Sequence, residues 1–166
     1  MVFSINCHTG EFSLTECFAE KFLRKTPGGA VGVFAASHAS YSGYNDGLTA
    51  GFFDAIWSDP GLIPEFGSGG ISNPNVAQHD PILHMGYVLN HGLLRMVETW
   101  DGSGNGNRYQ YELFHYFGDP AMRIYTSSPL AITADHPDTI AVETSFINIT
   151  NSNCPDAMAT AFYKGQ

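Results

Sequence analysis

The stretch Ile5-Asn6-Cys7-His8-Thr9-Gly10-Glu11-Phe12 predicts how this chain begins to fold. Residues 2–5 are a short apolar run typical of a buried strand, and Cys7 follows at the point where that strand should end in a loop. Beyond the turn, Ser13 and Glu16 have the spacing of a capping box, so a helix is expected next. This order would place the Cys7 thiol at the carboxyl end of a strand, where open α/β sheets bind their ligands.

Two interpretations of Cys7 are compatible with this position. Helix N-terminal dipoles near the loop would favour the thiolate, which is the form of cysteine that attacks carbonyl carbons. A free cysteine is more commonly a small buried hydrophobe, however. The local pattern leaves open whether Cys7 is a nucleophile or a core residue.

The composition indicates a globular protein and excludes some classes of function. The chain has 166 residues, enough to bury a core, and its 12 Phe and 8 Tyr are more than disordered chains contain. The formal net charge of −9 argues against a nucleic-acid partner, which requires a basic face. No run approaches the roughly 18 apolar residues of a membrane span. Three cysteines do not form a disulfide framework.

The start of the chain predicts that it is a piece of a longer protein. A secretory signal begins with a basic stretch and a longer apolar run, whereas the first lysine here is Lys21. Met1 instead leads almost directly into the first strand. We therefore expect further protein upstream.

The first part of the chain has the pattern of a βαβ unit. A helix is expected over residues 16–25, and the apolar run 30–36 is typical of a buried parallel strand. The unit would bring the ends of its two strands together, with Cys7 beside Ser37 and His38. The helix should pack on the sheet through a stripe formed by Phe18, Ala19, Phe22 and Leu23.

Two longer helices are expected next, on either side of an irregular loop over residues 58–79. Asp46 would cap the first of them, which ends at Trp57, and Asp80-Pro81 would begin the second. The apolar stripe of the first comprises Leu48, Phe52, Phe53 and Ile56, and that of the second comprises Ile82, Met85, Leu89, Leu93 and Met96.

The rest of the chain divides into shorter segments. Residues 101–107 form an Asp/Asn/Gly-rich turn that lacks the closing glutamate of a calcium loop. Residues 109–116 are expected to form a short helix and residues 121–126 a strand. After Pro129 the pattern changes to short alternating runs, at residues 130–134, 139–144, 146–150 and 158–163, which predicts the start of an all-β domain.

Three features together resemble the gingipain-type cysteine peptidases. Residues 6–12, followed by Cys17-Phe18-Ala19-Glu20, are similar to the nucleophile segment of that family. Phe117-Gly118-Asp119-Pro120-Ala121-Met122-Arg123 is similar to the last strand entry of its catalytic domain. The change of pattern after Pro129 is similar to the immunoglobulin-like domain that follows there.

The resemblance implies an α/β fold, part of a caspase-like three-layer sandwich with a mostly parallel sheet. Residues 1–128 would be the C-terminal part of the peptidase domain. Residues 129–166 would be the start of an immunoglobulin-like module, truncated because such a module usually has about 100 residues.

The resemblance also implies the site of a cysteine endopeptidase. Cys7 would attack the scissile carbonyl to give an acyl-enzyme, and its own backbone N–H would be one oxyanion donor. Ile5 and Asn6 would flank the S1 pocket, and Tyr41 and Tyr44 match the position of its aromatic walls. The loop that contains these tyrosines has no tryptophan, so an arginine or lysine preference is not expected.

The catalytic histidine of this family lies on a strand upstream of the nucleophile, outside this chain. His8 is a poor substitute because neighbouring side chains on an extended backbone point apart. His38 is the only candidate within the chain with a plausible position. The remaining histidines, His79, His84, His91 and His115 among them, show no metal-ligand spacing with the cysteines.

The expected partners are a protein or peptide substrate and the missing N-terminal part of the same protein, without nucleic acid or a membrane span. The resemblance implies a secreted or cell-surface location. Calcium is common among such relatives, but no metal ligand or other cofactor is assigned. Two alternatives stay open: a sortase-like transpeptidase, in which an amine resolves the thioester, and a non-catalytic surface or adhesive protein on a peptidase scaffold.

Overall fold

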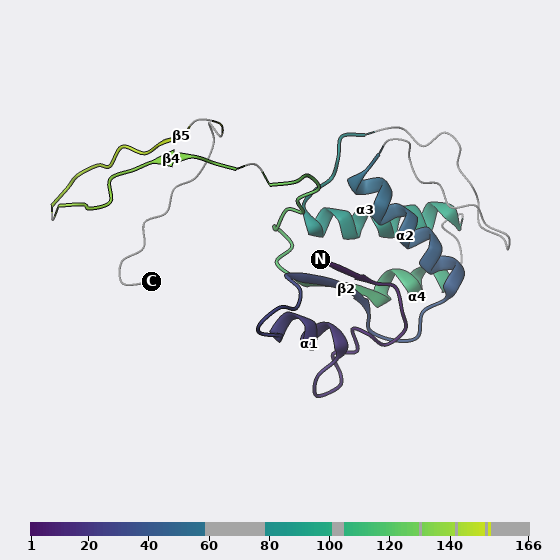
Figure 1. Ribbon diagram of the computed structural model, residues 1–166. Helices are drawn as coiled ribbons and strands as arrows, with labels where there is room; N and C mark the ends of the chain where they lie inside the picture. The colour runs from purple at the N-terminus through teal and green to yellow at the C-terminus, as the bar shows by residue number, and fades with distance from the viewer. Residues whose placement is uncertain (59–78, 101–104, 130, 142, 152, 154–166) are drawn as a thin grey trace. The chain divides into compact units, whose positions relative to one another are not determined.

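The computed structural model describes residues 1–58, 79–100, 105–129, 131–141, 143–151 and 153 (Figure 1). The chain divides into two compact units, residues 1–125 and residues 126–166. The first unit contains a three-stranded sheet and the described helices. The second contains a short antiparallel pair, β4 (Ala134–Asp135) and β5 (Thr150–Asn151).

The sheet of the first unit is small and mixed. Its strand order is β1 (Val2–Ser4), β2 (Gly32–Ala36) and β3 (Phe114–Gly118). β1 and β2 are parallel, as the βαβ pattern predicts, and β3 is antiparallel to β2. The described sheet is therefore mixed, and the expectation of a mostly parallel sheet holds for β1 and β2 but not for β3, which runs in the opposite direction.

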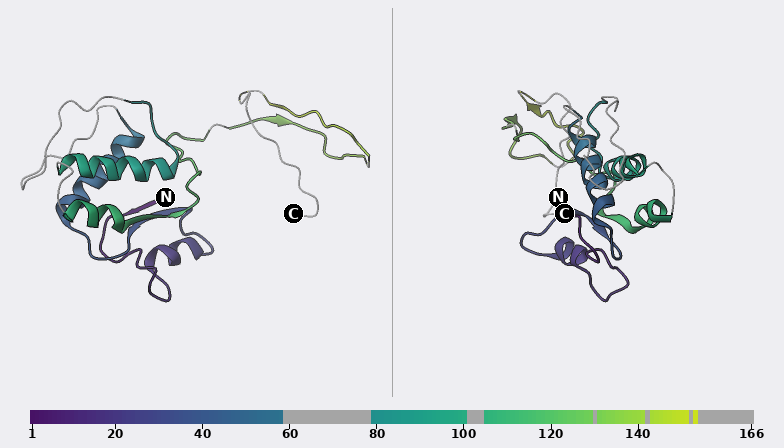
Figure 2. Two further views of the ribbon diagram at one scale, coloured as in Figure 1. Left: turned by 180° about the vertical axis from the view of Figure 1, so that it is seen from behind. Right: turned by 90° about the vertical axis from the view of Figure 1, so that its right-hand side faces the viewer.

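Helices lie on both faces of this sheet (Figures 1 and 2). All five residues of β2 are buried, and the four that follow Gly32 alternate between two core clusters. Val33 and Ala35 face the side of α1 (Phe18–Arg24). Phe34 and Ala36 face a larger cluster formed with α2 (Ser42–Ile56), α3 (Met85–Thr99) and α4 (Asn105–Leu113). Burial of the central strand on both faces explains its uninterrupted apolar sequence.

The helices α2 and α3 approach each other at positions without side chains. A Cβ atom on Gly92 of α3 would lie 2.4 Å from the ring of Phe52 on α2. A Cβ atom on Gly51 of α2 would lie 2.7 Å from the Cα of Gly92. Glycine at both positions therefore sets how closely the two helices pack, since protein interiors leave no space for an added methyl group.

The first helix begins later than the sequence predicts. Cys17 is its N-cap, and the Cys17 N–H donates to Glu20 Oε2 at 2.9 Å, so the capping box uses Cys17 and Glu20. The prediction of a box at Ser13 and Glu16 is wrong. The predicted stripe is also only partly buried: Ala19 and Phe22 pack on the sheet, whereas Phe18 and Leu23 are exposed.

The two long helices exist, but their starts differ from prediction. α2 begins at Ser42 with Tyr41 as N-cap, ahead of the predicted Asp46. α3 begins at Met85, beyond the predicted Asp80-Pro81. The segment before α3 is held by other backbone bonds: the Ile82 N–H donates to the Ala55 carbonyl at 2.7 Å, and the Leu83 carbonyl accepts from the Ile124 N–H at 2.9 Å. The predicted stripes are otherwise correct, except that Phe53 is 36% exposed.

The predictions near the end of the first unit are wrong in two places. Residues 114–116 belong to β3, because five consecutive residues there pair with β2, and only the first part of the predicted helix is helical. Residues 121–126 form no strand; Arg123 makes a single bridge with His84. Residues 101–104 of the predicted turn lie outside the described residues, and Asn105 begins α4.

The second unit shows few of the predicted strands. Among its described residues only Ala134–Asp135 and Thr150–Asn151 pair, so residues 139–141, 143–144 and 146–149 are not in strands. Residues 158–163, like residues 59–78 of the irregular loop, lie outside the described residues. No described helix is long and apolar enough to span a membrane.

Candidate functional site

The loop after β1 is tied to the end of β2. The His8 N–H donates to the His38 carbonyl at 3.0 Å, and the Gly10 N–H donates to the Ala36 carbonyl at 2.8 Å. A Cβ atom on Gly10 would lie 2.7 Å from the ring of Phe117, so the loop can approach the sheet this closely only with glycine here. The prediction that the ends of the two strands lie side by side is confirmed.

The Cys7 side chain is exposed and makes its hydrogen bonds with Ser40. The Ser40 N–H donates to Cys7 Sγ at 3.2 Å, and the Ser40 hydroxyl lies 3.6 Å from the same atom. The Ser40 N–H, and then its hydroxyl group, lower the pKa of the Cys7 thiol, because both stabilise the thiolate. Cys7 is therefore not a core residue, whereas Cys17 is 2% exposed and is one.

A buried polar network holds Ser40 in place. Asn45 Nδ2 donates to the Ser40 hydroxyl at 2.9 Å, and Gln110 Nε2 donates to Asn45 Oδ1 at 3.2 Å. Gln110 Oε1 also accepts from the Tyr41 N–H at 3.2 Å. The Gln110 side chain is fully buried, so its amide orients the Ser40 loop from within the first unit. This role could not be predicted from the sequence, because Gln110 lies between exposed tyrosines in a polar helix.

The predicted pocket residues surround Cys7 unevenly. Asn6 is exposed beside it, and Ile5 packs partly against the larger core cluster. Tyr41 is exposed and lies next to Ser40, with its ring 5.6 Å from that of Tyr109. Tyr44 instead stacks on Trp100 at 4.5 Å and packs against the core. Asn6 and Tyr41 are therefore the most solvent-accessible of the four predicted pocket residues.

Two histidines lie near the Cys7 loop, and both have other partners. His8 Nδ1 lies 2.7 Å from Glu11 Oε2, and His38 Nδ1 lies 3.1 Å from the Tyr109 hydroxyl. The two rings are 4.9 Å apart. His8 has a φ of 60°, so its backbone is not extended as the sequence argument assumed. Within the described part of the chain, neither imidazole is hydrogen-bonded to the thiol.

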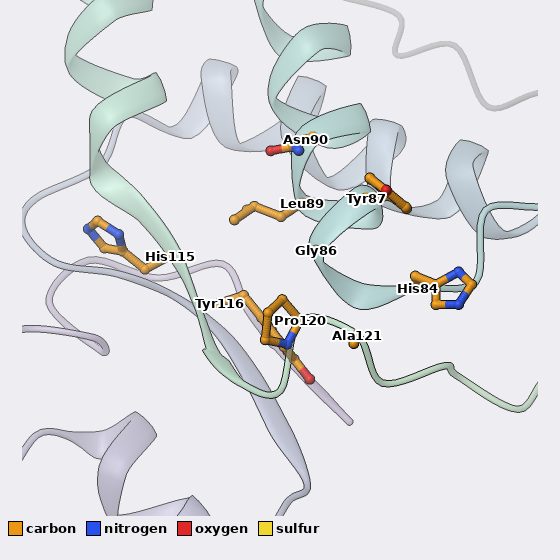
Figure 3. A pocket seen from close by; sticks show the side chains of 9 residues that line it. All are labelled: His84, Gly86, Tyr87, Leu89, Asn90, His115, Tyr116, Pro120 and Ala121. Carbon is orange, nitrogen blue, oxygen red and sulfur yellow. The ribbon is translucent and has the colours of Figure 1, made fainter.

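A cavity of about 810 Å³ lies on the other side of β3, between that strand and the start of α3 (Figure 3). Its lining includes Asn90, His115 and Tyr116, but not Cys7. Burial lowers the pKa of His115, and its Nε2 lies 3.2 Å from the Ser37 hydroxyl. The candidate site is the Cys7 thiol, because the residues that line the cavity include no cysteine, serine or threonine.

One group of potential metal ligands occurs among the described residues. They are Asp54 of α2, His79 of the segment before α3, and His91 of α3, and their ligand atoms lie within 4.8 Å of one another. The sequence did not predict this group, because its members are far apart along the chain and form no local motif.

The family of this protein is shown by its sequence over the whole first unit. A sequence profile of Peptidase family C25 matches residues 1–125, and the chain belongs to this family. The match includes Cys7 and every residue of the network behind it. A search of curated proteins found no significant match.

Solved structures of gingipains share the fold. The chain is similar to the crystal structure of the Arg-specific cysteine proteinase gingipain R (RgpB), with 19% identity and a TM-score of 0.60. That alignment covers 90% of this chain and 31% of the gingipain chain. A complex of the pro- and mature domains of RgpB from Porphyromonas gingivalis gives 19% identity, a TM-score of 0.57 and coverages of 90% and 32%. The chain therefore spans about a third of the length of these proteins.

Proposed function

We propose that this chain is the C-terminal part of a gingipain-like cysteine endopeptidase, with Cys7 as its nucleophile. The observation that carries the proposal is the exposed Cys7 thiol, which accepts the Ser40 N–H at 3.2 Å and has a lowered pKa. A thiol with a lowered pKa has more of the reactive thiolate near neutral pH. Membership of Peptidase family C25 supports the same role.

In this proposal Cys7 Sγ attacks the scissile carbonyl carbon of a peptide. The carbonyl oxygen becomes an oxyanion, which the Cys7 N–H stabilises, and the amine leaves as the thioester forms. Water then hydrolyses the thioester and restores the thiol. The His8 N–H donates to the His38 carbonyl, so it is not free to be a second oxyanion donor.

The general base of this reaction would be a histidine upstream of this chain. Glu11 and Tyr109 already bind the two nearby imidazoles, which makes His8 and His38 weak candidates. Alone, the chain should therefore be inactive or nearly so. Asn6 and Tyr41, with Ile5 and Tyr44 behind them, would contact the substrate residues on either side of the scissile bond.

The wider assignments belong to the same proposal. Residues 1–128 would be part of a caspase-like catalytic domain, and residues 129–166 the start of an immunoglobulin-like module. The end of the family match at residue 125 and the division between the two units at the same position support a boundary here. The protein would be secreted or displayed at the cell surface and act on proteins or peptides.

The test compares this chain with a version extended upstream to include the preceding strands. We expect the extended protein to cleave a mixed peptide library and Cys7→Ala to lose at least roughly 1,000-fold in activity, because the nucleophile is gone. Cys17→Ser is the matched control: it changes a buried thiol in the same segment and keeps an N-cap residue, so activity should stay.

Two outcomes would overturn the proposal. An extended protein in which Cys7 has an ordinary pKa and no peptide is cleaved would indicate a binding protein on a peptidase scaffold. Products that join the acyl group to an added amine, without hydrolysis, would indicate a transpeptidase.

A further inference from the structure

Asp54 is a carboxylate buried between α2 and α3. Asp54 is only 1% exposed to solvent. Burial alone would raise the pKa of Asp54, but hydrogen bonds from His91 Nε2 at 2.8 Å and Arg95 Nε at 3.0 Å outweigh it and hold the pKa below the usual value. The group is therefore ionised at neutral pH and has imidazole and guanidinium neighbours.

His79 faces this carboxylate with an atom that has no hydrogen bond. Its Nδ1 lies 2.8 Å from the Asp80 carbonyl oxygen, which can only accept, so Nδ1 carries the hydrogen. When the His79 ring is neutral, its Nε2 atom carries the lone pair and is an acceptor. This Nε2 is buried, lies 3.6 Å from Asp54 Oδ2 and has no hydrogen-bond partner among the described residues. Two acceptors thus face each other, an arrangement that a cation between them would stabilise.

The separations suit a tetrahedral transition-metal ion. With metal–ligand bonds of about 2.0–2.1 Å, tetrahedral ligand atoms lie roughly 3.4 Å apart. His91 Nε2 and His79 Nε2 lie 2.8 and 3.6 Å from Asp54 Oδ2, on either side of that value. The Nδ1–H bond from His79 to a backbone carbonyl is the outer contact that metal-bound histidines usually make.

We propose that Asp54, His79 and His91 bind one zinc ion, with a fourth ligand from solvent. His91 Nε2 would bind the ion through its lone pair, after the hydrogen that it donates to Asp54 has moved to Nδ1 or to solvent. Two imidazoles and one carboxylate suit zinc, whereas calcium takes six to eight oxygen ligands. The charge of Arg95 does not prevent this, because its Nη1 also binds Glu98 at 2.7 Å, which leaves the group with a net negative charge. The ion would link α2, α3 and the segment before α3.

The test is zinc titration of the full 166-residue chain after removal of metal by a chelator. A Cys7→Ser background prevents binding at the exposed thiol. We expect one equivalent of zinc to bind by calorimetry and to raise the melting temperature. His79→Gln and His91→Gln should each weaken binding by at least roughly tenfold, because each removes one of three protein ligands. Circular dichroism without metal checks that both variants fold.

The matched control is His84→Gln, which changes the N-cap of α3 outside the group and should leave binding intact. Cobalt adds an independent measurement: it should give the visible absorption of a tetrahedral ion in the control and lose it in the two histidine variants. If His79→Gln and His91→Gln both bound zinc as tightly as the parent chain, the ion would lie elsewhere and the proposal would be overturned. So would the absence of binding at micromolar zinc, which would leave an ion-pair cluster around Asp54.

Discussion

The properties of Cys7 depend on one neighbour that the sequence does not place beside it. Ser40 is on the loop after β2, and its N–H and hydroxyl both contact the thiol. The βαβ pattern predicted that the two loops meet, but not which atoms meet. Asn45 and Gln110 determine that detail, and both are ordinary polar residues in the sequence.

Asn45→Ala should slow the labelling of Cys7 without a change at Cys7 itself. The variant removes the amide that holds the Ser40 hydroxyl, so the pKa of the thiol should rise and labelling by iodoacetamide at pH 7 should slow severalfold; each pKa unit means about tenfold less thiolate. Thr49→Ala is the control, because its hydroxyl bonds only to a carbonyl within α2. Equal labelling rates in Asn45→Ala and the parent chain would show that the network does not position Ser40.

The ionised Asp54 carboxylate should raise the free energy of unfolding at all pH values above the acid range. Its folded pKa lies below the unfolded value of about 3.9, so this contribution is complete above that value and is lost as the pH falls through the folded pKa. In metal-free buffer, the free energy of unfolding of Asp54→Asn should therefore change less between pH 5 and pH 2 than that of the parent chain. Asp46→Asn, an exposed change on the same helix, is the control. Parallel pH profiles for Asp54→Asn and the parent would contradict the assignment.

At the scale of elements, glycine sets the separation of α2 and α3. Gly92→Ala should destabilise the fold by about 1–3 kcal/mol in urea unfolding, because the added methyl group would lie 2.4 Å from the Phe52 ring. Gly47→Ala is the control on the same interface: its Cβ would meet Met96 at 3.4 Å, an ordinary contact, and alanine favours the helix. Destabilisation of both variants to the same extent would show that helix separation is not the cause.

The sequence predicted elements better than their ends. The apolar run of β2 was recognisable because the strand is buried on both faces. Asp80-Pro81 looked like a helix start, but Ile82 and Leu83 use their backbone groups to bond Ala55 and Ile124, so the helix begins at Met85. Residues 114–116 looked helical because no local pattern shows that β2 lies opposite them. Local propensity does not contain these tertiary contacts.

At the scale of the whole molecule, the sequence indicated the α/β class and the family, since residues 6–12 and 117–123 occur together in the right order. The mixed sheet depended on the direction of β3, which the sequence did not reveal. The group of Asp54, His79 and His91 also could not be found, because only the tertiary packing of α2, α3 and the segment before α3 brings these residues together.

The hydrogen bond from Ser40 to Cys7 has one further consequence. It joins two loops that are distant in the chain, and breaking it would return the thiol to its ordinary acidity. The alkylation rate at a fixed pH would therefore register the separation of these loops before global unfolding. A single cysteine would then serve as a probe of local native-state opening, measured in the folded protein as denaturant is added.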